Sequence, residues 1–263
     1  MSARVVALGS ADAFCAAGRG HTCWLLEDAR GLALIDFGAT GLLALARLGI
    51  DPERIDSVHF THLHGDHIAG WPFLLLDALY LRRRTRPLQV TGPAGTRERL
   101  ASLFAACYAD TAGRGLPFAL DICELAPGDA REICGRRVTA FRAQHMRPPH
   151  VALSLRIDGP AGALAFTGDT GAHEGLDLLS RGADALFAEC TELHAPALAA
   201  DSGHLSWDEL RLILPRLGVP RIALAHLGAA VRAAAHSIEI EARALGLSLT
   251  VCDDLTEIPL GRD

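Results

Sequence analysis

The sequence predicts an α/β protein in which two β-sheets pack face to face and helices cover their outer sides. Short apolar runs of strand length alternate with longer segments of helical periodicity at both ends of the chain, and the middle is rich in strands. Half of the 263 residues are hydrophobic, which is enough to bury a large core. Helical segments on either side of many strands are typical of sheets stacked between helical layers.

The first half of the chain alternates strands with helices. Apolar runs predict strands at residues 4–8, 23–27, 32–36, 57–60 and 88–92. Helical periodicity predicts helices at residues 41–49, 68–83 and 94–110. Gly49 gives the first of these helices a stop signal. Pro72 must lie in the first turn of the second helix, where the N–H that proline lacks would have no intrahelical partner.

The second half begins with strands and then returns to alternation. Strands are predicted at residues 118–125, 131–143, 151–157 and 163–169, with Pro-Gly and Asp-Gly turn signals among them. Further along, residues 183–190 and 221–227 are expected to be strands, and residues 206–217 and 229–246 helices. Ser206 and Glu209 have the spacing of a capping box. No linker, low-complexity segment or repeat divides the sequence, so residues 1–263 are expected to form one domain.

Composition excludes some functions. All 25 basic side chains are arginine, so mechanisms that need a lysine base or a Schiff base are excluded. The net charge of −6 counts against a protein that binds nucleic acid mainly through phosphate contacts. The seven cysteines are scattered without a C-x-x-C pair, no signal peptide opens the chain, and no apolar run suggests a membrane span. We therefore expect a cytoplasmic protein with reduced thiols and no membrane contact.

The stretch VHFTHLHGDHIAG concentrates potential metal ligands. His62 and His64 are two positions apart and would point to one side of an extended chain. Gly65 allows a sharp turn, after which Asp66 and His67 start the next helix and point elsewhere. Imidazole and carboxylate ligands suit Zn²⁺, and also Mn²⁺ or Fe²⁺. A histidine-rich surface turn is the alternative, but this pattern favours two adjacent metal sites.

Five motifs spread along the chain resemble one family. FTHLHGDHIAG is similar to the signature of the metallo-β-lactamase superfamily, and in particular to the ribonuclease Z group. LGSADAF, LIDFGAT, FTGDT and LAHL follow the order of motifs in that group. The resemblance implies an αββα four-layer sandwich of the metallo-β-lactamase type and a metal-dependent hydrolase with two divalent ions. Zn²⁺ is the expected metal, with Mn²⁺ or Fe²⁺ as alternatives.

The resemblance also assigns ligands residue by residue. It implies a first metal held by His62, His64 and His145, a second held by Asp66, His67 and His226, and Asp169 as the bridge. His145, Asp169 and His226 each lie at the C-terminal end of a strand-like run, where sites in α/β proteins collect. Taken singly, the three could instead be a loop histidine, a turn aspartate and a buried histidine.

The same resemblance implies catalytic roles for three residues. Asp66 would orient the attacking hydroxide as well as bind metal. His204 in SGHLSWDEL would be the general acid for the leaving alkoxide, and Glu189 in FAECTEL would orient it and raise its pKa. Alternatively, His204 only precedes the capping box and Glu189 only ends a strand. His59 needs no ligand role.

The segment between His145 and Asp169 bears on the substrate. Ribonuclease Z enzymes that process tRNA in bacteria carry a tRNA-binding arm there, whereas only 23 residues separate the two positions in this chain and residues 151–167 read as a plain hairpin. Extended tRNA binding is therefore not expected, and a small phosphodiester such as a cyclic nucleotide or a short oligonucleotide is. The basic run at residues 82–86 could touch phosphate or cap a helix. The candidates for lining a substrate pocket are Arg147, His150, His173, His194 and His236.

Other functions remain open on sequence alone. A tRNA 3′-processing endonuclease of the ribonuclease Z type is one alternative, and a lactone or thioester hydrolase on the same fold is another. A metal-binding regulatory protein without turnover would be expected to lack some ligands, and all seven expected ligand types are present. By analogy with the group, a homodimer is possible.

Overall fold

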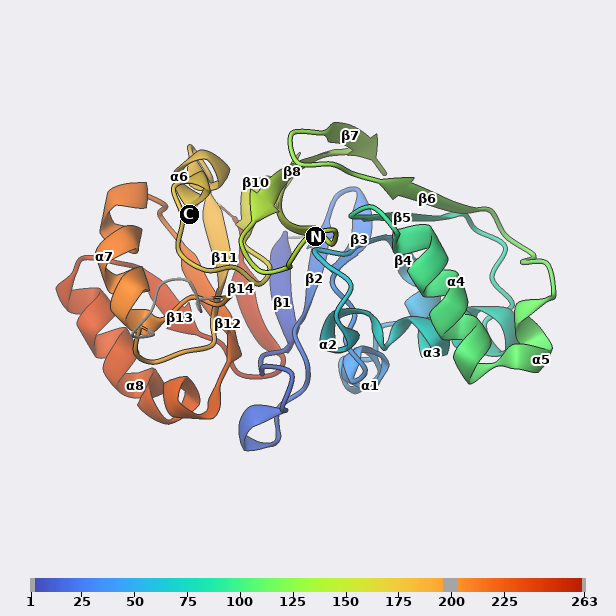
Figure 1. Cartoon of the computed structure of the whole chain (residues 1–263), viewed down its shortest axis with the longest axis horizontal. Helices are drawn as coiled ribbons and strands as arrows, with labels where there is room; N and C mark the ends of the chain where they lie inside the picture. Colours follow the sequence, from blue (N-terminus) through green and yellow to red (C-terminus); the bar gives the residue numbers. More distant parts are fainter. Residues whose placement is uncertain (1–2, 196–202, 262–263) are drawn as a thin grey trace.

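The computed structural model describes residues 3–195 and 203–261. Within them, two seven-stranded sheets pack face to face between two helical layers (Figure 1). The αββα four-layer sandwich predicted from the sequence is confirmed. In the described part of the chain, every helix is too short or too polar to span a bilayer.

The first sheet comes mainly from the N-terminal half. Its strands, in spatial order, are β14 (Thr256–Pro259), β1 (Arg4–Gly9), β2 (Cys23–Asp28), β3 (Gly31–Ile35), β4 (Ile55–His59), β5 (Leu88–Gly92) and β6 (Leu120–Glu124). From β3 to β6 the strands are parallel. The helices of this half are α1 (Gly41–Arg47), α2 (Gly65–Ile68), α3 (Trp71–Leu76), α4 (Thr96–Cys107) and α5 (Ala109–Ala112). Short helical turns are η1 (Ala16–Gly18), η2 (Pro52–Arg54) and a π-helical turn η3 (Asp77–Leu81).

The second sheet comes from the C-terminal half. Its strands, in spatial order, are β13 (Leu249–Val251), β12 (Ile222–Leu227), β11 (Ala185–Cys190), β10 (Gly162–Phe166), β9 (Ala152–Gly159), β8 (Arg136–Ala143) and β7 (Ala130–Ile133). Strands β10 to β13 are parallel, and β9 and β10 form a hairpin. The helices of this half are α6 (Gly175–Ser180), α7 (Trp207–Leu217) and α8 (Ala229–Ala244), which lie together on one side in Figure 1.

Alternation of side chains along each strand produces the layers. In β1, Val5 belongs to the core between the sheets, whereas Val6 belongs to the core between the first sheet and its helices. Between the sheets, the Trp24 ring meets Phe187 edge-on at 5.1 Å, and Phe187 stacks on Phe166 at 4.6 Å. Both faces of each sheet are buried, which explains why most strands read as continuous apolar runs.

Three sequence predictions need correction. Residues 131–143 form two strands, not one, because Cys134 and Gly135 turn the chain with positive φ angles of 49° and 75°. The helix expected over residues 68–83 is divided into α3 and the π-helical turn η3. Strands β13 and β14 were not expected, since runs of three or four residues carry too weak an apolar pattern.

The basic run at residues 82–86 contains a structural arginine. The side chain of Arg84 is only 2% exposed. Its guanidinium donates hydrogen bonds to the carbonyl oxygens of Ile55 at 2.8 Å and Pro87 at 2.7 Å, and also to those of Glu53 and Arg86. Arg84 therefore fixes the connection into β5 and cannot reach a phosphate in this position.

A buried ion pair joins the two sheets. Arg136 of β8 donates to Asp28 at the end of β2, at 2.6 and 3.1 Å, and both side chains are at most 1% exposed. The same guanidinium donates to the carbonyl oxygen of Gly31 at 2.8 Å. Two well-placed bonds satisfy the carboxylate, so removal of one partner leaves an uncompensated buried charge.

We predict that Asp28→Ala lowers the free energy of unfolding by about 3–5 kcal/mol, because Arg136 stays buried without its counter-charge. Urea denaturation followed by far-UV circular dichroism would measure this. The matched control is Asp158→Ala, which breaks the partly exposed pair with Arg156 and should cost less than about 1 kcal/mol. Equal losses in the two variants would contradict the assignment.

Candidate metal centre

Strand ends from both sheets supply the predicted ligands. The segment with His62 and His67 follows β4, His145 follows β8, Asp169 follows β10, and His226 lies near the end of β12. In each sheet these strands run in the same direction, so their C-terminal ends meet at one edge. The sequence suggested that the strand continues into His62 and His64. In the structure the strand stops at His59, and both histidines nevertheless reach this edge.

The structure brings all seven predicted ligands together in two adjacent groups. His62, His64 and His145 form the first group, and Asp66, His67, Asp169 and His226 form the second. Within each group, the potential ligand atoms all lie within 4.8 Å of one another. Both groups have the chemistry and spacing that a metal ion needs.

Asp169 lies between the two groups. Its Oδ2 is 3.2 Å from Nε2 of His67 and of His226, and 3.8 Å from Nε2 of His62 and of His145. Burial alone would raise the pKa of Asp169, but the neighbouring His226 and His67 outweigh it and hold that pKa well below its usual range. One charged oxygen thus faces imidazoles of both groups, where a ligand shared by two metal ions would lie.

Two observations fit metal ions in the first group. Nε2 of His62 is buried without a hydrogen-bond partner, and burial lowers the pKa of this imidazole well below its usual value. Such an orphaned nitrogen is costly unless something binds its lone pair. Nε2 of His145 lies 3.0 Å from Nδ1 of His64. Two nitrogens bound tetrahedrally to one zinc ion would be about 3.3 Å apart, given Zn–N bonds of about 2.0–2.1 Å.

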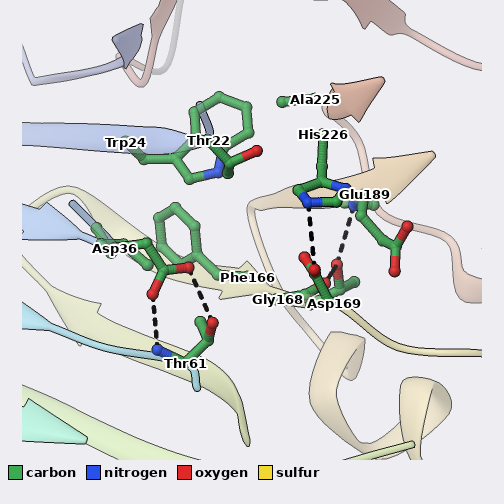
Figure 2. Close-up of a pocket in the computed structure, with 13 residues that line it drawn as sticks. Thr22, Trp24, Asp36, Thr61, Phe166, Gly168, Asp169, Glu189, Ala225 and His226 are labelled. Atoms are coloured by element: carbon green, nitrogen blue, oxygen red, sulfur yellow. Dashed lines mark hydrogen bonds and ion pairs between the residues drawn. The ribbon is translucent and has the colours of Figure 1, made fainter. Parts of the chain in front are cut away.

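Neighbouring groups orient the ligand rings. Nδ1 of His67 donates to Asp36 at 2.8 Å, and Asp36 also accepts bonds from the backbone N and the hydroxyl of Thr61 (Figure 2). Nδ1 of His145 donates to the carbonyl oxygen of Gly203 at 2.8 Å. Because a carbonyl only accepts, Nε2 of His145 keeps its lone pair for the cluster. The carboxylates of Asp169 and Asp36 overcome burial and raise the pKa of His67.

Thr191 links the second group to a Glu–His pair. Its Oγ1 lies 2.6 Å from Oε2 of Glu189 and 2.7 Å from Nδ1 of His226. A hydroxyl has one hydrogen, and the carboxylate is the stronger acceptor. We infer that Thr191 donates to Glu189 and accepts from Nδ1 of His226. Nε2 of His226 then faces Asp66 at 3.3 Å and Asp169 at 3.2 Å with its lone pair available.

His204 and Glu189 form the predicted pair beside the cluster. Nδ1 of His204 donates to Glu189 at 3.0 Å, and the carboxylate is only 2% exposed and also accepts from the backbone N of Thr170. Burial would lower the pKa of His204, but the hydrogen bond and charge of Glu189 outweigh it and raise the pKa to about 9. The His204 ring contacts those of His145 and His226, at centroid distances of 4.8 and 5.3 Å. A protonated imidazole therefore borders the cluster.

The residues suggested for a substrate pocket do not join the cluster. His194 pairs with Asp208 on the surface, and His236 is exposed on α8. Arg147 and His150 are exposed in the loop after β8, and the half-buried His173 accepts a bond from the next turn. In residues 3–195 and 203–261, no hydrogen bond or ion pair connects these side chains to the predicted ligands. Sequence spacing alone does not determine where a loop side chain points.

Three polar residues of the site had no assigned role from the sequence. Asp36 belonged to a quoted motif, and Thr61 and Thr191 stood beside predicted site residues. Each of the three follows the end of a strand, and this position was the sequence signal that could have identified them as site residues. His59, for which no ligand role was needed, is buried with its ring nitrogens against the hydroxyls of Ser57 and Thr91.

The amino-acid sequence of this chain is similar to those of known proteins. The family model of the β-lactamase superfamily domain matches residues 33–227. A ribonuclease Z from Methanothermobacter thermautotrophicus is 28% identical in an alignment that covers 85% of this chain and 86% of that protein.

Solved structures share the fold. The metallo-β-lactamase fold protein YhfI from Bacillus subtilis superposes with a TM-score of 0.79 at 19% identity, covering 98% of this chain and 99% of that one. A diphosphatase from the PhnP family superposes with a TM-score of 0.73 at 17% identity, covering 97% of each chain. At these identities the two structures establish the common architecture.

We predict that Thr191→Val weakens metal binding by about 10- to 100-fold, because Nδ1 of His226 loses its acceptor and Glu189 loses a donor. Competition with a chromophoric chelator would measure the affinity. Thr191→Ser keeps the hydroxyl and should bind metal nearly as tightly as the wild type. Wild-type affinity in the valine variant would show that Thr191 does not orient His226.

Proposed function

The chain belongs to the metallo-β-lactamase superfamily of hydrolases, and we propose that it is a phosphodiesterase that holds two divalent metal ions and cleaves a small phosphodiester. The observation that carries the proposal is the position of Asp169 between two ligand groups, with the His204–Glu189 pair alongside. Two bound ions would activate water at neutral pH and neutralise phosphate oxygens. A paired acid beside them suits a substrate whose leaving group needs a proton.

Zn²⁺ is the metal we propose for both positions. The groups offer imidazole nitrogens and carboxylate oxygens, a donor set that zinc, manganese and iron all accept. No cysteine belongs to either group in the described part of the chain, which favours an open catalytic site over a closed structural one. His62, His64 and His145 would hold one ion, Asp66, His67 and His226 the other, and Asp169 both.

Asp66 and His204 take the two roles in proton transfer. Burial would raise the pKa of Asp66, but the neighbouring imidazoles of His226 and His67 outweigh it and lower that pKa, so the carboxylate stays charged. It can then accept a hydrogen bond from the attacking water and orient it. His204, kept protonated by Glu189, donates a proton to the departing alkoxide.

Two features support a small substrate. Residues 152–166 form the plain hairpin of β9 and β10 where tRNA-processing relatives are expected to carry an arm. The net charge of −6 is unfavourable for a long polyanion. A cyclic nucleotide or a short oligonucleotide fits these two features better than tRNA.

The names of the similar proteins, a ribonuclease and a diphosphatase, both denote hydrolysis at phosphorus.

We predict that the purified protein loaded with Zn²⁺ or Mn²⁺ hydrolyses bis(p-nitrophenyl) phosphate and cyclic nucleotides more efficiently than precursor tRNA. Lactones and glutathione thioesters complete the panel, and turnover is measured for each. Asp66→Ala should reduce phosphodiester turnover by at least about 10²-fold with an unchanged circular dichroism spectrum. Lactone or thioester turnover without phosphodiester turnover would overturn the proposal.

We predict that His204→Ala slows cleavage of alkyl phosphodiesters by about 10²–10⁴-fold, because the alkoxide leaves without a proton. Esters of p-nitrophenol should be affected by only about a few-fold, since that leaving group is stable as an anion. The measurement is kcat for both substrate classes. Equal losses on the two classes would remove His204 from the role of general acid.

A further inference from the structure

Phe14 is the most exposed large hydrophobic side chain among the described residues, at 90% accessibility. It lies between β1 and β2, in the loop that projects at the lower edge of Figure 1. Burial of such a ring would stabilise the fold, and this position forgoes that contribution. The ring therefore adds nothing to the core and is available for contacts outside the chain.

Asp12 holds this loop in one conformation. Its Oδ1 accepts hydrogen bonds from the backbone N of Phe14 at 3.1 Å and of Ala16 at 3.2 Å. Its carbonyl oxygen accepts from the backbone N of Cys15 at 3.2 Å. Cys15 and Ala17 have positive φ angles of 54° and 53°, which residues other than glycine rarely adopt. The exposed ring is thus presented by an ordered turn.

One end of the loop contacts the strand that carries His226. The backbone N of Asp12 donates to the carbonyl oxygen of Leu227 at 3.4 Å, and the backbone N of Leu227 donates to Ser10 at 2.9 Å. Leu227 directly follows His226, which faces Asp66 and Asp169. The chain before Phe14 is therefore fixed beside the second ligand group.

The chain after Phe14 is fixed beside Asp66. Sγ of Cys15 lies 3.2 Å from Nε2 of His21. A Cβ atom at Gly38 would lie 2.4 Å from Cβ of His21 and 2.3 Å from the carbonyl oxygen of Asp66, so these two residues meet at this glycine. The chain on both sides of Phe14 is thus held by contacts that lead to two predicted ligands, His226 and Asp66.

We propose that Phe14 determines specificity by stacking on the nucleobase of a nucleoside phosphodiester whose phosphate occupies the metal centre. The proposal rests on the proposed function. In a small nucleoside phosphodiester the phosphate and sugar are polar, and the base is the flat, largely apolar part. Aromatic rings stack on any base, and this stacking strengthens binding of the nucleotide.

The test uses two substrates with the same leaving group, thymidine 5′-p-nitrophenyl phosphate and methyl p-nitrophenyl phosphate. We predict that Phe14→Ala lowers kcat/KM for the thymidine ester by about ten-fold, mainly through KM, and leaves the methyl ester within about two-fold. Phe14→Trp should retain the preference for the thymidine ester. The melting temperature should not change, because the ring is exposed.

Leu212→Ala on α7 is the matched control, since Leu212 is also exposed, at 70%, and should affect neither ester. Equal loss on both esters, or no loss on either, would overturn the stacking role. Loss of thymidine activity together with dissociation of an oligomer in size-exclusion chromatography would also overturn it, because the ring would then pack on a second copy.

Failure of the proposed function gives a different result. If the wild type cleaves neither ester, the phosphodiesterase proposal fails, and stacking is tested by calorimetric binding of thymidine 5′-monophosphate to the metal-loaded protein. Phe14→Ala should then weaken binding by about ten-fold. Unchanged binding in that variant would overturn the inference independently.

Discussion

The site depends on the contacts between the buried carboxylate of Asp169 and the imidazoles that surround it from both sheets. A lone carboxylate with 3% exposure would be strongly unfavourable. It is tolerable here because ring nitrogens of His67 and His226 lie 3.2 Å from its Oδ2. The site therefore requires strands of both sheets to end at the same edge.

Hydrogen bonds from neighbouring groups fix which ring nitrogen of each ligand histidine points into the cluster. Asp36, the carbonyl of Gly203 and Thr191 each occupy one ring nitrogen of a ligand histidine, so the other nitrogen is directed inwards. Asp36 and His226 both adopt positive φ angles, of 57° and 52°. Such strain persists only where the surroundings fix the backbone firmly, and it clusters at functional sites. Rigidity at the metal centre is thus supplied by residues that would not themselves bind metal.

Much of this could be predicted from the sequence because the ligands lie at or shortly after the ends of apolar runs. A polar residue directly after a buried strand has few positions available, and parallel strands bring such residues to one edge. The hairpin at Cys134 and the short strands β13 and β14 were missed because their local patterns are weak. The role of Thr191 was inaccessible, since it depends on a 2.7 Å approach to a histidine 35 positions away. The buried Arg84 looked like a surface charge for the same reason.

The residues proposed for chemistry and the residue proposed for recognition lie in different parts of the fold. The ligands and the Glu189–His204 pair lie on strand ends and are fixed by buried hydrogen bonds, so a substitution there disturbs several partners at once. Phe14 lies in a loop between two strands, and its exposed side chain has no packing role in the described chain. Residues in such loops can change without altering the metal centre. Relatives with the same reaction chemistry are therefore expected to differ in substrate through their loops, and the loop between β1 and β2 is where this chain presents its exposed ring.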